Sequence, residues 1–477
     1  MIIYWPSSSI NICSTGLSIS RLGRRPAIGG IFKVDDGHQK MRGNRFHGIK
    51  VRNKTGGVSH DAGKLRHHFD KIFLPEEVGE FAETIFTHLP GMRNERWFIA
   101  AEEETGEIAS AFALIPWTWE MAGTKLKVAE MGIVGTGEVH RNRGLLRLLY
   151  REFDATLTEE GFDLAVVQGI PGFYNRFGYY YSIPLEPHID IPLHLVPDST
   201  GDDDGDGGAY EFRLAESEDA AFLEGEDERY RRSNFLSAFR DDAHWKYLLT
   251  FSPKIGCGSE FWIMEGRETE ERCYFRIPRQ GFGAGLIVSE VSEGISDDAL
   301  TNLLAFCKKM CAERNKPYIR LNLALESTAA KTAISFGASV GRPYAWQIKI
   351  PDRGRFLGKI APVLEARLKK SSLAGFTGTL RLDLYCEQID LCWSEGRLES
   401  VTSGRGGECE KAFFIPEDLF APLVLGHRTW RELQDIRPDL FHAMMYVGPG
   451  VDSASDKTVR LIDSLFPAER SWVYEQY

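Results

Sequence analysis

Two neighbouring stretches decide how this chain is expected to fold: EMGIVGTGEVHRNRGLLRLLYREF at residues 130–153 and GIPGFYNRFGYY at residues 169–180. In the first stretch, the apolar pattern predicts a β-strand over Met131 to Thr136 and, after a short basic loop, a helix whose leucines recur every three to four residues. A second strand is predicted over Leu164 to Gln168. The expected order is therefore strand, loop, helix, strand.

The loop between the first strand and the helix, His140 to Gly144, carries the chemistry. Arg141, Arg143 and the backbone of Gly144 lie at the start of the predicted helix. Unpaired N–H groups and the helix dipole favour an anion at such a position. We therefore expect the loop to bind a pyrophosphate. The alternative for so short a motif is a solvent-exposed basic helix start.

A family resemblance rests on these residues. Arg141-Asn-Arg-Gly144 fits the R-x-x-G signature of the GNAT acyl-CoA-dependent acetyltransferases. The longer string His140-Arg-Asn-Arg-Gly-Leu-Leu146, followed by Phe173-Tyr-Asn-Arg-Phe-Gly178, resembles the Eis-type aminoglycoside acetyltransferase branch of that superfamily. The resemblance implies an α+β, or mixed α/β, protein with two GNAT domains, the second degenerate, and a C-terminal sterol-carrier-like domain.

The length of 477 residues by itself predicts two to four domains. With the resemblance, five segments are expected: a basic extension at 1–52, a catalytic GNAT domain at 53–192, an acidic Gly/Asp linker at 193–209, a degenerate GNAT domain at 210–352 and a sterol-carrier-like domain with a functional C-terminus at 353–477. The extension is expected to be disordered, with a transit peptide as the alternative.

The second GNAT domain is expected to lack a cofactor site. After a strand predicted over Leu286 to Val291, it carries SEGISDD at residues 292–298 in place of a basic glycine loop. Carboxylates at this place would repel a pyrophosphate. In the linker, three aspartates match the first half of an EF-hand calcium loop, but Arg213 stands where that loop needs its last acidic ligand, so no metal is expected.

The resemblance implies the acyl-CoA site residue by residue. In GNAT folds the pantetheine of CoA pairs with the central strand, and the loop and helix start surround the pyrophosphate. Acetyl-CoA is therefore the expected co-substrate. The expected cofactor-binding residues are Val134, Gly135, Thr136, Arg141, Asn142, Arg143, Gly144, Leu145, Leu146, Arg147, Gly169 and Ile170.

Two tyrosines are expected to carry the chemistry. Tyr174 occupies the tyrosine position of F-Y-x-R-F-G, which in Eis-type enzymes is the general acid for the departing thiolate. An aromatic packing residue is the alternative. The resemblance also implies that the C-terminal α-carboxylate, here that of Tyr477, enters the active site as the base, with a frayed C-terminus as the alternative. His140 is expected to be a contact or a cap rather than a base.

Composition limits the partners. The net charge of −11 argues against non-specific nucleic-acid binding and is compatible with cationic substrates. No run approaches the ~18 consecutive apolar residues of a membrane helix, so no membrane association and a cytoplasmic location are expected. The eight cysteines show no paired C-x-x-C spacing, which indicates neither disulfides nor a zinc site. Cys307 and Cys311 are expected to lie in a core.

The expected function is acetyl transfer from acetyl-CoA to a primary amine of a small cationic acceptor, such as an aminoglycoside or a polyamine, by direct attack. Two alternatives stay open. One is a lysine or peptide N-acetyltransferase of the same fold, and the other is a non-catalytic acyl-CoA- or lipid-binding protein. The resemblance further implies a homo-oligomer, commonly a hexamer.

Overall fold

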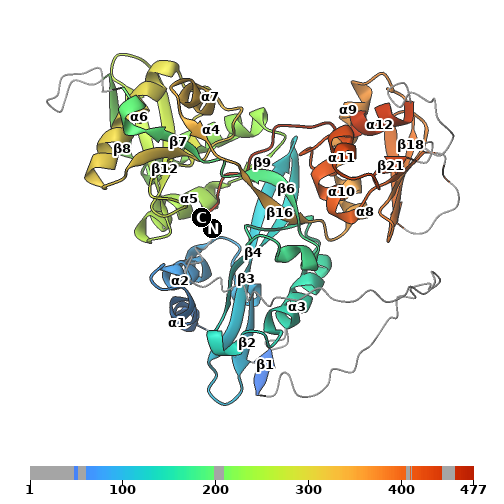
Figure 1. Ribbon diagram of the computed structural model, residues 1–477, viewed down its shortest axis with the longest axis horizontal. Helices are drawn as coiled ribbons and strands as arrows, with labels where there is room; N and C mark the ends of the chain where they lie inside the picture. The colour runs from blue at the N-terminus through green and yellow to red at the C-terminus, as the bar shows by residue number, and fades with distance from the viewer. Residues whose placement is uncertain (1–47, 52–60, 198–208, 404–408, 410, 443–456) are drawn as a thin grey trace, which may run out of the picture.

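The computed structural model describes residues 48–51, 61–197, 209–403, 409, 411–442 and 457–477. These residues form three units, seen in Figure 1 as a lower, an upper left and an upper right part. The first unit contains an eight-stranded sheet, the second unit two four-stranded sheets and the third unit a five-stranded sheet. Most of the predicted extension, and most of the linker with its calcium-like sequence, lie outside the described residues.

Helices cover both faces of the sheet in the first unit. Helices α1 (Ala62–Phe73) and α2 (Val78–His88) pack on one face, and α3 (Leu145–Glu159) packs on the other. The strands follow the order β1 (Ile49–Val51), β2 (Trp97–Glu102), β3 (Ile108–Met121), β4 (Thr124–Thr136), β5 (Leu164–Val167), β16 (Tyr344–Lys349) and β6 (Tyr180–Leu185), and β9 (Leu236–Phe239) pairs with β3.

Strand β3 runs through Pro116 without a break. The strand can be continuous because two different strands pair with its outer edge, one on each side of the proline. Strand β2 pairs with β3 as far as Ala113, and β9 pairs with β3 from Thr118 onward. Pro116 lies between these two pairings, where its missing N–H costs no ladder hydrogen bond. On the same side of the sheet, β1 pairs with β2, so the predicted extension at 1–52 includes a strand.

The second unit consists of two sheets with four helices. One sheet has the order β13, β11, β10, β8, and the other has the order β12, β14, β7, β15. The strands are β7 (Ile189–Pro192), β8 (Tyr210–Leu214), β10 (Ser259–Gly266), β11 (Arg272–Pro278), β12 (Leu286–Val288), β13 (Glu290–Val291), β14 (Tyr318–Leu321) and β15 (Ser339–Val340). The helices are α4 (Ala220–Ser233), α5 (Asp242–Thr250), α6 (Asp297–Glu313) and α7 (Thr328–Ser335).

Strands are exchanged between the first two units, so the sheets do not end at the boundaries expected from the sequence. Strand β7 precedes the linker but pairs with β14 and β15 of the second unit. Strand β16 follows the second unit but lies between β5 and β6 of the first. Strand β9 lies between α4 and α5 of the second unit in the sequence, but its residues pair with the far end of β3. Each exchange depends on a partner distant in sequence.

The third unit packs five helices against its sheet. Its strand order is β19 (Arg397–Ser403), β18 (Gln388–Ser394), β17 (Gly378–Asp383), β20 (Ala412–Phe414) and β21 (Phe441–His442). The helices are α8 (Arg353–Lys359), α9 (Ala361–Lys369), α10 (Glu417–Val424), α11 (Trp430–Ile436) and α12 (Lys457–Leu465). Helices α8 and α9 are separated at Ile360, because Pro362 in the first turn of α9 lacks the N–H that an uninterrupted helix would use. The sterol-carrier likeness stays a prediction.

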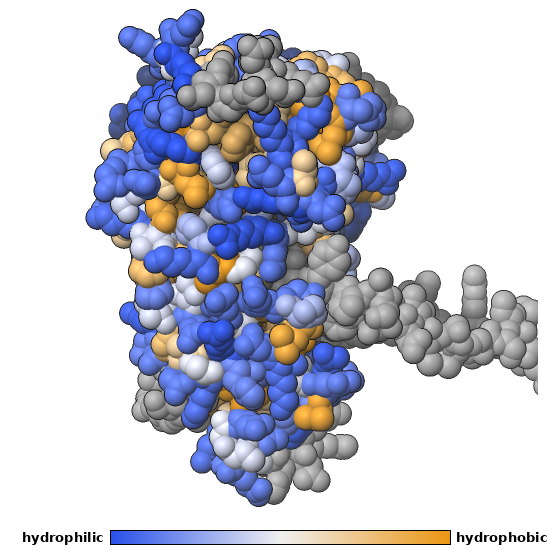
Figure 2. All heavy atoms as spheres, turned by 90° about the vertical axis from the view of Figure 1, so that its left-hand side faces the viewer, coloured by the Kyte–Doolittle hydropathy of each residue, from blue (hydrophilic) through white to orange (hydrophobic). Residues whose placement is uncertain are grey.

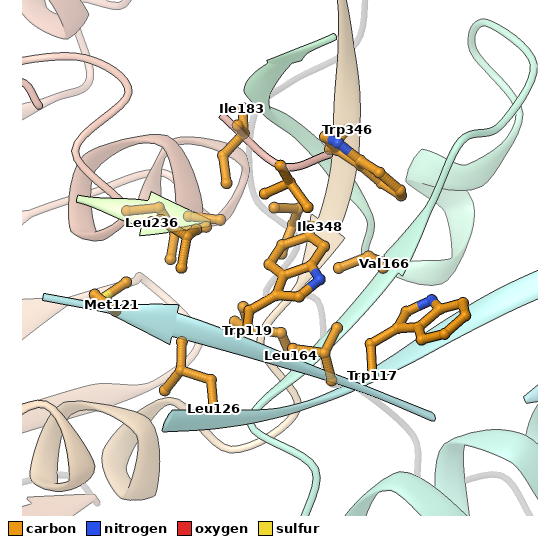
Figure 3. Close-up of a cluster of buried hydrophobic side chains, with 14 of the residues drawn as sticks. Trp117, Trp119, Met121, Leu126, Leu164, Val166, Ile183, Leu236, Trp346 and Ile348 are labelled. Carbon is orange, nitrogen blue, oxygen red and sulfur yellow. The ribbon is translucent and has the colours of Figure 1, made fainter. Parts of the chain in front are cut away.

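The units share one hydrophobic core. Figure 3 shows its centre, where β3, β4, β5, β6, β9 and β16 each contribute side chains around Trp119. The Trp119 and Trp346 rings meet edge to face with centroids 5.5 Å apart. Because Trp346 comes from β16, this contact fixes the returning strand in the first sheet. The core continues without interruption to Phe413 and Leu423 of the third unit.

Two further observations concern the surface and the helices. On the face drawn in Figure 2 hydrophilic residues predominate, and hydrophobic residues lie in small separate areas. Of the helices in the described part of the chain, none is long and apolar enough to cross a membrane. Cys307 and Cys311 are buried on α6, which confirms the prediction that they are core residues.

Candidate active site

Strand β4 contains a β-bulge near its end. Ala111 of β3 pairs with Gly135 of β4. Two residues further along β3, Ala113 pairs with Gly132, which is three residues away on β4. The extra residue bends the strand, and Ile133 takes a φ of 51°, in the left-handed region that β-branched residues rarely adopt.

Just before the bulge, β4 separates from β5. The parallel pairing of the two strands ends at Glu130 and Val166, whereas β4 continues to Thr136. Residues 131–136 therefore lack β5 as a neighbour, and the sheet is open between the two strands. An extended ligand can pair with this free edge of β4 as an added strand would.

The three residues expected to hold pantetheine lie on this free part of β4. A Cβ at Gly135 would approach the Phe69 ring and Ile72 Cδ1 of α1 to 3.0 Å each, so the strand passes close to the helix. On the β3 side, Thr136 Oγ1 lies 2.8 Å from Ser110 Oγ. The end of β4 is therefore fixed against α1 and β3, while its other edge faces the opening. Val134 is half-buried.

Helix α3 begins beside this opening without a side-chain cap. Its N-cap is Gly144, which has a φ of 83°, and its first turn contains no acidic residue. Because glycine offers no side-chain oxygen to the first N–H groups, an external anion can take the place of a cap. Arg141, Asn142 and Arg147 are exposed around this helix start. The predicted phosphate-binding residues thus lie together and are accessible.

His140 fixes one arginine of the loop. Its Nδ1 lies 3.1 Å from Arg143 Nη1, and its Nε2 lies 3.3 Å from Glu102 Oε1. A guanidinium can only donate, so Nδ1 accepts from Arg143, while Nε2 faces the Glu102 carboxylate. Both ring nitrogens are therefore engaged. The arrangement suits the expected contact role of His140 and gives it no free nitrogen for use as a base.

Tyr174 lies across the opening, just after β5. It is the first residue of a short 3-10 helix, Tyr174–Phe177, and is buried. Its ring packs on Gly169, where a Cβ would come within 2.2 Å of the ring. The Gly169 carbonyl accepts hydrogen bonds from Tyr344 Oη at 2.5 Å and Gln347 Nε2 at 2.9 Å. Strand β16 thus positions the loop that carries Tyr174.

Burial raises the pKa of the Tyr174 phenol, so the group keeps its proton at neutral pH. The neighbouring rings of Phe173 and Tyr179 lie 5.0 and 6.2 Å away between centroids and hold the ring edge to face. Ile170, which was expected to contact the cofactor, is 40% exposed beside this loop.

The ring of Tyr477 is buried on the opposite face of the same sheet. It packs edge to face against Phe81 of α2 and Trp117 of β3, with centroids 5.0 and 5.4 Å apart. Burial, together with the nearby Glu130 carboxylate, raises the pKa of the Tyr477 phenol. Trp117 Nε1 donates to Glu130 at 2.7 Å, which fixes that carboxylate next to the tyrosine. The C-terminal residue is therefore held in the fold.

The main chain of the last residues is held by the second unit. Arg276 Nη2 donates to the main-chain oxygen of Tyr477 at 2.6 Å, and His244 Nε2 lies 2.6 Å from the Gln476 carbonyl. Arg240 and Arg276 both donate to the Glu475 carbonyl, at 2.6 and 2.5 Å. These contacts were not predicted from the sequence. The available signal was a charged residue, Arg276, inside a strand that otherwise reads as buried.

A cavity of about 550 Å³ opens beside Tyr477, between the first and second units. Its lining has four acidic and four basic side chains: Glu76, Glu186, Glu260, Glu475, Arg276, Arg279, Arg314 and Lys316. Glu260 pairs with both Arg279 and Arg314, at 3.6 and 2.8 Å. The main-chain oxygen of Tyr477 adds a hydrogen-bond acceptor to this lining, in which acidic and basic side chains are equal in number. The cavity reaches Tyr477 but is not lined by Tyr174 or by the start of α3.

Comparison with protein families identifies the part of the chain that contains the opening. Residues 64–182, from α1 to β6, match the family described as Acetyltransferase (GNAT) domain. This part of the chain is a GNAT acetyltransferase domain. The match includes β4, the start of α3 and Tyr174, so the protein is an acyltransferase of the GNAT type. A search of curated proteins gives no significant match.

Solved structures share the fold of this GNAT acyltransferase over nearly its whole length. A probable N-acyltransferase from Enterococcus faecalis V583 matches with a TM-score of 0.61 and 14% identity, covering 90% of this chain and 99% of the other. A GCN5-related N-acetyltransferase from Anabaena variabilis matches with a TM-score of 0.58 and 14% identity, covering 89% and 99%. Eis1 from Mycobacterium abscessus matches with a TM-score of 0.53 and 14% identity, covering 90% and 100%. At these identities the likeness shows the fold.

Proposed function

We propose that the protein transfers an acetyl group from acetyl-CoA to a primary amine of a cationic acceptor of the aminoglycoside or polyamine kind. The observation that carries this proposal is the opening between β4 and β5 beside the uncapped start of α3. Pantetheine would pair with the free edge of β4 at Val134 to Thr136. The pyrophosphate would then lie at Arg141, Arg143 and the first N–H groups of α3.

The acceptor would approach from the cavity beside Tyr477. In this proposal the α-carboxylate of Tyr477 takes the proton of the acceptor ammonium. This negative charge adds to the otherwise balanced lining and favours a cationic acceptor. The free amine attacks the thioester carbonyl, and a new C–N bond forms as the C–S bond breaks.

Tyr174 would then protonate the departing thiolate, and the proton that the acceptor nitrogen loses on forming the amide restores the phenol. Tyr174 belongs to the core on the α3 face of the sheet, and Tyr477 belongs to the core on the α1 and α2 face. Groups on opposite faces can act on one thioester here because the sheet is open between β4 and β5. Direct transfer by this route needs no acyl-enzyme. The proposed route of transfer does not depend on the proposed homo-oligomer.

The experiment is acetyl-CoA turnover, followed by thiol release, against aminoglycosides, polyamines and lysine peptides. We expect turnover with the first two classes, and a loss of about 100-fold in kcat for Tyr174→Phe, within the usual range for general acid–base catalysis. Tyr179→Phe is the matched control, because it makes the same chemical change at a buried ring next to Tyr174. Turnover with lysine peptides alone would favour the lysine acetyltransferase. Acetyl-CoA binding without turnover of any amine would favour the binding protein.

A further inference from the structure

The second unit contains an opening like that of the first. Strand β12 pairs with β14 in parallel over Leu286 to Val288, and one residue later β13 pairs with β11 instead. The strand that precedes helix α6 therefore leaves its parallel partner part-way along, as β4 leaves β5. In each unit, the helix that follows connects the separating strand to the parallel partner that it has left. The second unit thus repeats the geometry that would hold acetyl-CoA in the first.

In the second unit the chain itself reaches this opening. Tyr474 lines a small pocket together with residues 291–294, just beyond the point of separation, and with Leu323 and residues 327–329 on the other side. Its ring stacks on Tyr230 with centroids 4.2 Å apart and is buried. Arg470, at the start of the same segment, pairs with Glu293 at 3.1 Å. We call residues 470–477 the tail.

The start of α6 is also closed to an anion. Ser296 is its N-cap, and its side chain accepts a hydrogen bond from Ala299 N at 3.1 Å. Asp297 and Asp298 occupy the first turn. The cap occupies one of the first N–H donors, and the carboxylates interact favourably with the helix dipole that a phosphate would otherwise use. Both halves of an acyl-CoA site are therefore replaced in the second unit.

Beyond Tyr474, three side chains of the second unit hold three consecutive main-chain oxygens. Arg240 and Arg276 donate to Glu475, His244 donates to Gln476, and Arg276 donates to Tyr477. Arg240 and Arg276 are almost completely buried and share the buried carboxylate of Glu290, at 2.6 and 2.8 Å. Removing an acceptor from a buried arginine is costly, so the tail belongs to the network.

We propose that the second unit positions the tail for the reaction of the first unit: its opening binds Tyr474, and Arg240, His244 and Arg276 hold the last three residues so that the Tyr477 carboxylate faces the acceptor. The three are positioning residues. This inference rests on the proposed function, because it gives the tail a role only if the Tyr477 carboxylate takes part in the transfer. It assigns a task to a unit that has no phosphate loop of its own.

The test uses His244, whose replacement leaves the buried arginines and Glu290 in place. His244→Ala should lower kcat about tenfold, the size of one lost hydrogen bond, with the KM for acetyl-CoA unchanged. His244→Gln, whose amide can donate to the Gln476 carbonyl, should restore much of kcat. In the same proteins, carboxypeptidase should release Tyr477 faster from His244→Ala than from the parent or from His244→Gln. His442→Ala, at a buried histidine of the third unit, is the control for lost volume.

An unchanged kcat in His244→Ala would overturn the proposal, and so would a lower kcat with the tail as resistant to carboxypeptidase as in the parent. A chain without residues 475–477 separates this inference from the proposed function. If that chain transfers acetyl groups at the parental rate, the role of the Tyr477 carboxylate is wrong, and the positioning role is wrong with it. If it is inactive while His244→Ala behaves as the parent does, only the positioning role is wrong.

Discussion

In the first unit β4 leaves β5 beside a helix that begins with Gly144 and follows two arginines, whereas in the second unit the strand at Leu286 to Val291 leaves β14 beside a helix that begins with Ser296 and two aspartates. The backbone opening is alike in both places. A cap without a side chain and a positive loop leave the first opening available to a phosphate ester. A capped, negative helix start goes with an opening that Tyr474 of the same chain reaches. We infer that the side chains at the helix start select the occupant of each opening.

The largest expected effect comes from reversing the charge of the first opening. Arg141→Glu together with Arg143→Glu should weaken acetyl-CoA binding about 100-fold or more, because each charge-assisted hydrogen bond to a phosphate contributes about 1.5–3 kcal/mol. The measurement is a calorimetric titration with acetyl-CoA. Arg151→Glu, which reverses a charge at an exposed site further along α3, is the control and should bind as the parent does. Equal losses in both would mean that only the overall charge matters.

The pH dependence of stability tests whether the tail network depends on a neutral histidine. Burial lowers the pKa of His244 to about 4 in the second unit, and of His68 to about 4 under β4 in the first. An unfolded histidine has a pKa near 6.5, so below that pH the unfolded chain binds more protons than the folded one. The resulting stability is present above pH 6.5 and is lost as the pH falls toward 4.

Each of these shifts corresponds to about 3 kcal/mol of unfolding free energy between pH 6.5 and pH 4. Denaturant unfolding at pH 7 and pH 5 should therefore show a less stable protein at pH 5. His244→Gln cannot gain the proton and should be less sensitive to pH than the parent. An equal loss of stability in parent and variant would show that His244 does not titrate on unfolding.

A smaller effect is expected at Gly169, which supports Tyr174. Gly169→Ala would place a Cβ 2.2 Å from the Tyr174 ring and displace it, and should lower kcat about tenfold through misplacement of the proton donor. Gly225→Ala, in α4 of the second unit, is the control, because a Cβ there meets no atom within 4 Å. It should leave kcat unchanged and stabilise the fold by about 0.4–1 kcal/mol. A Gly169→Ala enzyme with parental kcat would remove Tyr174 from the mechanism.

The smallest expected effect concerns the cap of α6. Ser296→Ala removes the hydrogen bond to Ala299 N and should destabilise the protein by about 1 kcal/mol, measured by denaturant unfolding. Acetyl-CoA binding should not change, because Tyr474 still lies at the second opening. A second molecule of acetyl-CoA bound by this variant would show that the cap, rather than the tail, closes that site.

The local part of this fold could be predicted from the sequence. The elements from Met131 to Gln168 follow from apolar spacing and from one glycine, and Gly144 indeed takes the left-handed conformation that a cap of this kind requires. Cofactor and catalytic roles for the residues around it stay predictions, because the structure places these residues without a substrate. The structure adds that these residues surround one opening in the sheet.

The non-local part could not be predicted, because each piece depends on a partner far along the chain. The apolar residues of β16 read equally well as a strand of the second unit, and only pairing with β5 and β6 places them in the first. Arg240, His244 and Arg276 lie more than 190 residues before the tail in the sequence. No spacing rule connects them to it. The charged positions within apolar strands were the one clue that buried partners exist.

The central claim is that the two openings have different occupants, acetyl-CoA in the first and the tail in the second. Calorimetric titration of the full chain with acetyl-CoA tests it most directly, because it counts the sites. The account predicts one acetyl-CoA per chain, with the site lost in the Arg141→Glu, Arg143→Glu variant. Two sites per chain, or one site that survives this substitution, would contradict it.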